Sequence, residues 1–253
     1  MDKPTARNTS AGRFYTIGDN DDYVSVTTPL GNLSVKYIKV WEALVGKTKA
    51  KIVCNRAGNY GTAIHDFAEK IALGKLKDTK HIAKKYAKDV DALLVWFKEN
   101  VEEILGEPEL TVYSTSLKLA GTIDLVCRLK GRTGVYICDY KTGRMKDEHF
   151  LQLAAYVSLI RMCPVPFVLS DTEEIHRLVI AIKGGKITEV PPDKRNPDKD
   201  ISIEEDWYVY LGVLSLWHWY QTRKSDKPKR AVRKVKNRRH IPKTRGKNKR
   251  KKL

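Results

Sequence analysis

The chain has 253 residues, with 48 lysines and arginines, 30 aspartates and glutamates, and a formal net charge of +18. This length supports one substantial hydrophobic core. No stretch approaches the roughly 18–20 apolar residues of a membrane span, and the polar start lacks a signal-peptide pattern, so we expect a cytoplasmic protein that is neither secreted nor membrane-bound.

The first half of the chain is predicted to be mainly helical. Residues 1–22 are polar and turn-rich, which indicates a flexible arm, and residues 23–28 alternate like a short strand. Apolar residues at helical spacing predict three helices, over residues 33–46, over a segment that begins at 49–51 or after 61 and ends at 74, and over residues 79–105.

The second half has a different pattern, in which short strands alternate with single helices. Helices are predicted over residues 148–162 and 203–221. Strands are predicted over residues 109–117, 120–128, 135–141, 178–182 and 186–190. This order indicates one mixed α/β domain over residues 23–223, with a central mixed β-sheet flanked by helices.

The positive charge is concentrated at the C-terminal end. Residues 223–253 contain 17 lysines and arginines and one acid, whereas residues 1–222 contain 31 basic and 29 acidic residues. Residues 224–253 also lack periodic apolar residues, so we predict a disordered basic tail. Cations near phosphates release counterions, so this tail is expected to tether the protein to nucleic acid, or to an acidic partner, through Arg233, Lys234, Arg238, Arg239, Lys243 and Arg245.

The hairpin from Gly121 to Lys141 carries the most informative residues. Asp124 lies on its first strand, and Asp139 and Lys141 lie two residues apart on the return strand, so their side chains share a face. Two acids and a lysine at one end of a sheet suit metal-dependent phosphodiester hydrolysis, because carboxylates hold the ion and a cation stabilises developing charge. Alternatively, Asp139 and Lys141 form a surface salt bridge, which would stabilise the fold little.

Four segments, in this order, resemble the PD-(D/E)XK nuclease superfamily and, within it, the RecB-type exonuclease branch. They are the helical GTAIH at 61–65, the GTID strand at 121–124, the DYK strand at 139–141 and the helical QLAAY at 152–156. The resemblance implies a restriction-endonuclease-like core. In size and motif order the chain is similar to phage recombination exonucleases and to the mitochondrial genome-maintenance exonuclease. Its acidic N-terminus is unlike a transit peptide, so we expect a phage or bacterial source.

The resemblance also implies a set of metal ligands. His65, Asp124 and Asp139 would bind Mg²⁺ or Mn²⁺, together with the backbone carbonyl of Tyr140. Glu109, which is predicted to begin the preceding strand, is a second-rank ligand. Without the other motifs, His65 would be read as an ordinary core or surface histidine.

The remaining residues of the resemblance have supporting roles. Lys141 would orient or activate the attacking water, or neutralise charge on the scissile phosphate. Gln152 and Tyr156 lie one helical turn apart, on a face that the family directs toward the active site and DNA. For Tyr156, a plain core position is an equally good interpretation.

Cysteine spacing separates this chain from relatives that hold an iron–sulfur cluster. Those nucleases use one cysteine before the core and three clustered after it, whereas here Cys127 and Cys138 fall within predicted strands and Cys163 alone follows. No iron–sulfur cluster is therefore expected. The sequence also contains no GxxxxGK[ST] motif, so we expect a nuclease without a fused helicase motor.

The leading hypothesis is a Mg²⁺- or Mn²⁺-dependent exonuclease that hydrolyses DNA in replication, recombination or repair. A structure-specific or restriction-like endonuclease would use the same centre, and a catalytically silent nucleic-acid-binding protein is the alternative from another class. The expected partners are single- or double-stranded DNA and recombination or replication proteins. The sequence leaves polarity, strand preference and oligomeric state open.

Overall fold

The computed structural model describes residues 4–192 and 202–225. Its strands are β1 (Thr5–Thr9), β2 (Gly12–Ile17), β3 (Asn20–Ser25), β4 (Val101–Ile104), β5 (Leu110–Ser114), β6 (Leu119–Ile123), β7 (Leu125–Leu129), β8 (Val135–Lys141), β9 (Ile175–Lys183) and β10 (Lys186–Val190). Its helices are α1 (Thr27–Val45), α2 (Lys47–Ala72), α3 (Lys84–Asn100), α4 (Glu148–Met162) and α5 (Ile203–Ser225). The predicted mixed α/β fold is confirmed.

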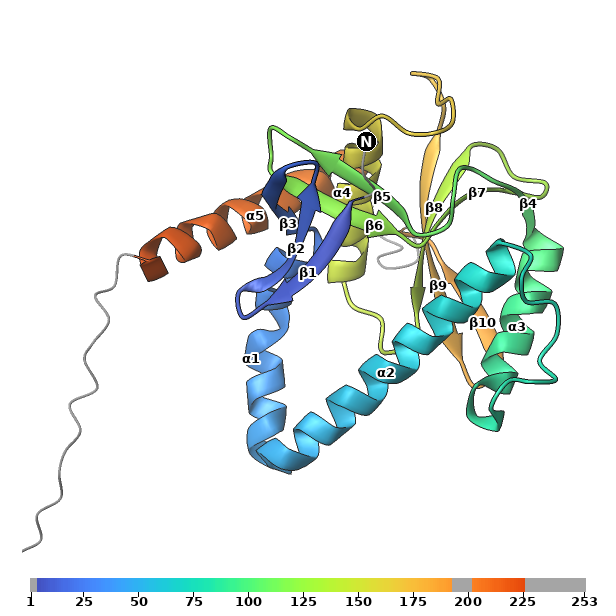
Figure 1. Cartoon of the computed structure of the whole chain (residues 1–253), viewed down its shortest axis with the longest axis horizontal. Helices are drawn as coiled ribbons and strands as arrows, with labels where there is room; N and C mark the ends of the chain where they lie inside the picture. The colour runs from blue at the N-terminus through green and yellow to red at the C-terminus, as the bar shows by residue number, and fades with distance from the viewer. Residues whose placement is uncertain (1–3, 193–201, 226–253) are drawn as a thin grey trace, which may run out of the picture.

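The described strands form two mixed sheets rather than one (Figure 1). The first has the order β1-β2-β3-β6-β5, in which β3 and β6 are parallel. The second has the order β10-β9-β8-β7-β4, in which β8 and β9 are parallel. The single strand predicted over residues 120–128 is therefore wrong: β6 and β7 belong to different sheets and meet at a bend at Asp124.

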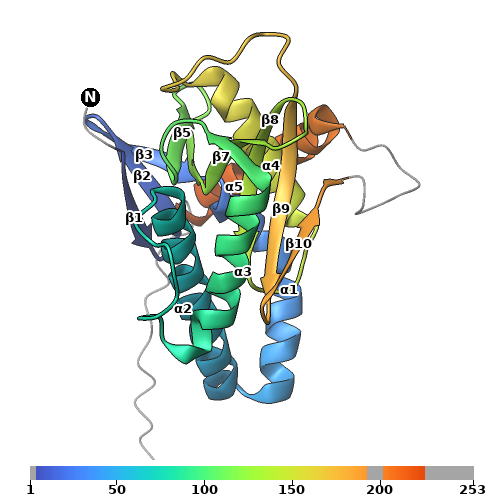
Figure 2. The same cartoon turned by 90° about the vertical axis from the view of Figure 1, so that its right-hand side faces the viewer.

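Helices cover both faces of the second sheet. Along β8, Val135 and Ile137 pack in the hydrophobic core that includes α4, whereas Cys138 and Tyr140 pack in the core that includes α2 and α3. Both faces of β8 are therefore buried, as its apolar pattern predicts. Figure 2 shows α2 and α3 running beside each other on the side opposite α4. Because α4 contacts both sheets and α5, ten of its 15 residues are buried.

The N-terminal residues differ most from their prediction. Instead of a flexible arm, β1, β2 and β3 form an antiparallel meander, and β3 joins the first sheet beside β6. The ring of Tyr15 is 2% exposed, and its hydroxyl lies 2.8 Å from Thr122 Oγ1. Every residue of the edge strand β1 is exposed, so its sequence carries no alternating apolar pattern that predicts a strand.

Several predicted boundaries also shift. The helix expected over residues 79–105 is α3 followed by β4, because the chain after Asn100 turns to pair with β7. The N-terminal helix begins at Thr27 rather than at Leu33. Gly46, with a φ of 87°, separates α1 from a continuous α2.

At the C-terminal end, α5 continues to Ser225, two residues into the predicted tail. A buried ion pair fixes this helix to the second sheet, with Arg177 Nη1 lying 2.5 Å from Asp206 Oδ2. The rest of the predicted tail, with its tether residues Arg233, Lys234, Arg238, Arg239, Lys243 and Arg245, lies outside the described residues. None of the described helices has the length and hydrophobicity needed to cross a bilayer.

Candidate active site

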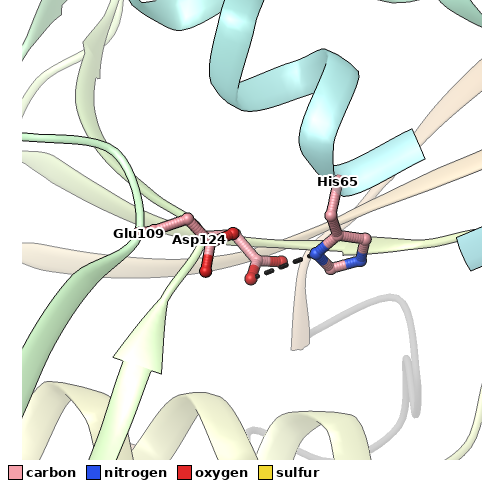
Figure 3. Close-up of side chains that lie close together, drawn as sticks. All are labelled: His65, Glu109 and Asp124. Atoms are coloured by element: carbon pink, nitrogen blue, oxygen red, sulfur yellow. Dashed lines mark ion pairs between the residues drawn. The ribbon is translucent and has the colours of Figure 1, made fainter. Parts of the chain in front are cut away.

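Three side chains from separate segments converge at the junction of the two sheets. His65 comes from α2, Glu109 from the loop before β5, and Asp124 from the bend between β6 and β7. Their candidate ligand atoms all lie within 4.8 Å of one another, and Figure 3 shows His65 facing the two carboxylates. We call these three residues the acidic cluster.

Asp124 is held in place by both partners of its carboxylate. Its Oδ2 accepts a hydrogen bond from the backbone N–H of Tyr140 at 2.7 Å, and its Oδ1 lies 3.4 Å from His65 Nδ1. Burial alone would raise the pKa of Asp124, but His65 and Lys141 lower it below its usual value. The bend therefore presents an ionised carboxylate to the cluster, at the position where β6 leaves the first sheet.

His65 makes contacts with both ring nitrogens. Its Nε2–H donates to the carbonyl of Tyr140 at 2.9 Å, while Nδ1 faces Asp124. Burial would lower the pKa of His65, but the Asp124 carboxylate outweighs it and raises this pKa to about 9. A metal ion bound to His65 must therefore displace a proton. In this conformation the Tyr140 carbonyl, a predicted ligand, is occupied by the histidine.

The sequence predicts that Glu109 begins a strand, but in the structure it lies in the loop before β5. Its φ is 57°, in the left-handed region, and its backbone N–H donates to the carbonyl of Asp124 at 3.2 Å; β5 begins one residue later. Non-glycine residues in this conformation are strained and are frequent at functional sites. Burial, and then the negative charge of Asp124, raise the pKa of Glu109 to about 7.

A second group of polar side chains surrounds the buried carboxylate of Asp139. This carboxylate is 1% exposed; Lys141 Nζ pairs with its Oδ2, and Gln152 Nε2 donates to its Oδ1 at 2.9 Å. Gln152 Nε2 also donates to the hydroxyl of Tyr156 at 3.1 Å. The alternative of a surface salt bridge is therefore wrong. We call these four residues the buried network.

The buried network shows which contacts its members make with one another. Asp139 is not part of the group of three whose ligand atoms lie close together, so its role as a metal ligand stays a prediction. Gln152 and Tyr156 are buried, and Gln152 donates both to Asp139 and to the Tyr156 hydroxyl. This face of α4 therefore lies against the candidate active site, while its contact with DNA stays a prediction. Burial raises the pKa of Asp139 to about 6, although Lys141 opposes the shift.

The glycine of the GTID segment has a steric role in this network. A Cβ atom on Gly121 would lie 2.5 Å from Tyr156 Cε1 and 3.0 Å from Val26 Cγ2, closer than packed atoms approach. The absence of a side chain at Gly121 therefore lets the Tyr156 ring lie against β6. The strand and helix segments of the resemblance are thus in direct contact.

Two residues of the acidic cluster, His65 and Glu109, line a cleft of about 480 Å³ together with Lys141. Two further lining residues, Arg13 and Thr142, were not singled out from the sequence. Thr142 could have been found, since it follows the DYK segment directly. Arg13 gives no such signal, because only the meander brings it to the cleft.

The acidic cluster fits a divalent metal ion. Two carboxylates and one imidazole are suitable ligands for Mg²⁺ or Mn²⁺. The raised pKa of Glu109 beside ionised Asp124 indicates that the second negative charge lacks sufficient compensation from the protein. A divalent cation would supply that compensation, with His65, Glu109 and Asp124 as its ligands.

Comparison with known proteins supports this assignment at the level of the superfamily. A search of curated proteins found no significant match. A family model described as the PD-(D/E)XK nuclease superfamily matches residues 64–164, a segment that contains the acidic cluster and the buried network. The match implies a nuclease, while the RecB-type branch stays a prediction. Over the segment that builds its candidate active site, the chain is similar to the PD-(D/E)XK nuclease superfamily.

Proposed function

We propose that this protein is a Mg²⁺- or Mn²⁺-dependent deoxyribonuclease that acts as an exonuclease in replication, recombination or repair. The observation that carries the proposal is the acidic cluster, two of whose residues, His65 and Glu109, line one cleft with Lys141. The proposal includes a phage or bacterial source and a cytoplasmic location. It also includes the basic segment 224–253 as a nucleic-acid tether.

In the proposed reaction, water attacks the scissile phosphorus and the P–O3′ bond breaks, which leaves a 5′-phosphate and a 3′-hydroxyl. His65, Glu109 and Asp124 would hold the metal ion. When bound, the ion would polarise the phosphate and lower the pKa of a bound water. Burial lowers the pKa of Lys141, but Asp139 reverses this effect and raises it above its usual value. Lys141 therefore stays protonated and acts as a fixed positive charge beside the phosphate rather than as a base.

The proposal retains Asp139 and the Tyr140 carbonyl as ligands in the metal-bound enzyme. Each has a competing partner in the structure: Lys141 for the Asp139 carboxylate and His65 for the carbonyl. Metal binding would have to exchange these contacts. If they persist, Asp139 acts instead by fixing Lys141 at the edge of the cleft.

The experiment that tests the function is cleavage of labelled DNA with Mg²⁺ or Mn²⁺. Single- and double-stranded substrates carry the label at the 5′ or the 3′ end, and Asp139→Ala and Lys141→Ala are compared with the wild type. Lys183→Ala, an exposed lysine at the end of β9, is the matched control. Cleavage by the wild type and the control, but by neither active-site variant, is expected. Variants as active as the wild type would contradict the site.

The shape of the substrate separates the candidate functions. An exonuclease needs an end, so it should degrade linear DNA and leave closed circular DNA intact. Cutting of the circle would identify an endonuclease with the same centre. DNA binding with no cleavage in either Mg²⁺ or Mn²⁺ would favour the catalytically silent nucleic-acid-binding protein.

A further inference from the structure

We infer that Arg13 binds a backbone phosphate of the nucleic-acid substrate next to the scissile bond. This inference rests on the proposed function and names a residue outside the segment that the family model matches. Arg13 lies on β2 and is exposed, and it lines the same cleft as His65, Glu109 and Lys141. The N-terminal meander therefore brings a cation to the rim of the acidic cluster.

The backbone at Arg13 is fixed to the start of α1. The N–H of Arg13 donates to Thr28 Oγ1 at 3.0 Å, and that hydroxyl lies 3.0 Å from the carbonyl of Arg13, to which it donates in return. The neighbouring Gly12 has a φ of 135°, and a Cβ there would lie 2.2 Å from Thr28 Cγ2. Glycine is thus required for this close approach, which places Arg13 reproducibly on the cleft side.

The side chain of Arg13 lies over the ring of Tyr15, which is hydrogen-bonded to the strand that leads to Asp124. Its guanidinium carbon lies 5.2 Å from the centroid of the buried Tyr15 ring, a cation–π contact. The Tyr15 hydroxyl is hydrogen-bonded to Thr122, two residues before Asp124 on the same chain segment. The guanidinium and the acidic cluster are therefore connected through β6.

The guanidinium keeps its hydrogen-bonding capacity for a ligand. None of the ion pairs among the described residues includes Arg13, whereas Lys141 is paired with Asp139. A planar guanidinium can donate two parallel hydrogen bonds to phosphate oxygens. A contact of this kind positions the backbone of any sequence, as a nuclease without base specificity requires.

A purely structural role makes a different prediction. Arg13 is one of the charges that lower the pKa of Glu109, so it could act only by stabilising the acidic cluster. Replacing Arg13 would then weaken metal binding, but it would not change which phosphates of the substrate matter. A position-resolved readout on the DNA separates these two roles.

The test is a methylphosphonate scan of the substrate. Single neutral methylphosphonates replace successive phosphates of an oligonucleotide, and dissociation constants are measured in EDTA for the full-length wild type, Arg13→Ala and Arg13→Lys. In the wild type, a methylphosphonate at one or two adjacent positions should weaken binding by about tenfold, the loss expected for one charged contact of roughly 1.4 kcal/mol. In Arg13→Ala the same substitutions should have no further effect. Arg13→Lys should show an intermediate loss.

Arg7→Ala is the matched control, because Arg7 lies over the Phe14 ring in the same meander and does not line the cleft. It should keep the wild-type profile. An Arg13→Ala profile identical to that of the wild type would overturn the inference. Cleavage by the wild type tests the proposed function separately. If the wild type does not cleave DNA but has the Arg13-dependent binding profile, the proposed nuclease activity is refuted and the Arg13–phosphate contact is supported.

Discussion

The acidic cluster and the buried network are neighbouring halves of one site, and they differ in how their charges are compensated. Asp139 has a cation and an amide donor as partners and is almost fully buried. Glu109 has a pKa of about 7 because burial and Asp124 both disfavour its charge. The difference indicates where an external cation belongs. Burial also raises the pKa of Asp139, to about 6, but a lysine of the protein lies beside this carboxylate. The carboxylates of the acidic cluster have no lysine or arginine among the ion pairs of the described residues, so a bound cation would supply the missing positive charge there.

The two halves also differ in their construction. The buried network comes from one strand, β8, and one helix, α4, and its members are spaced two or four residues apart. The acidic cluster comes from a helix, a loop and a bend that are far apart in the sequence. This contrast implies separate roles: the acidic cluster holds the metal ion, and the buried network fixes Lys141 at the edge of the cleft.

The largest effect is expected for Asp124→Asn, which removes a charge of the acidic cluster that also acts on Asp139 and Lys141 of the buried network. Cleavage in Mg²⁺ should fall by at least about 10³-fold, since metal binding and charge stabilisation both suffer. Single-turnover rates on labelled DNA measure this effect. Asp91→Asn, an exposed residue on α3, is the control and should retain full activity. A loss of less than tenfold in Asp124→Asn would place the metal elsewhere.

A smaller effect is expected for Gln152→Ala, which removes a donor from Asp139. The rate should fall by about 10–100-fold, as is usual when a supporting hydrogen bond is lost. The Mg²⁺ concentration for half-maximal activity shows which half Asp139 serves. If only the rate at saturating Mg²⁺ falls, Asp139 acts by positioning Lys141. If the Mg²⁺ concentration for half-maximal activity rises, Asp139 acts as a metal ligand. Wild-type values of both quantities would show that the network is dispensable.

The affinity for metal should depend on pH, because His65 is protonated below a pKa of about 9 in the metal-free protein. The ion competes with this proton, so Mn²⁺ affinity should increase by up to about tenfold per pH unit between pH 7 and 9. Calorimetry in buffers of different ionisation enthalpy would detect the released proton. Mn²⁺ affinity that is constant over this range would mean that His65 is not a ligand.

The smallest effect on chemistry is expected for Gly121→Ala, which tests the packing of β6 against Tyr156 of the buried network. The added methyl would collide with the Tyr156 ring and should lower the free energy of unfolding by about 1–3 kcal/mol. Urea denaturation measures this change. Gly212→Ala on α5 meets no atom within 4 Å and is the control. Equal stability of Gly121→Ala and the wild type would refute the close contact.

The regular elements of the second sheet are predictable from sequence because their signals are local. The helix predicted over residues 148–162 has the bounds of α4, and the strand predicted over 135–141 has those of β8. The shared face of Asp139 and Lys141 follows from strand geometry alone, and the two side chains do pair.

The features that the sequence does not predict depend on distant contacts. The break at Asp124 arises because β6 and β7 pair with strands of different sheets, while both are apolar and read as one strand. The left-handed backbone of Glu109 depends on its hydrogen bond to the same bend. The meander that positions Arg13 has an exposed edge strand, so no periodic pattern indicates it.

Anomalous diffraction from crystals grown with Mn²⁺ would show directly whether the acidic cluster binds the metal ion. We expect one strong manganese peak in the cleft, within bonding distance of His65, Glu109 and Asp124. Its distances to Asp139 and to the Tyr140 carbonyl would decide whether these groups complete the site. Manganese bound elsewhere, with the acidic cluster empty in a protein that cleaves DNA, would show that His65, Glu109 and Asp124 do not form the metal site.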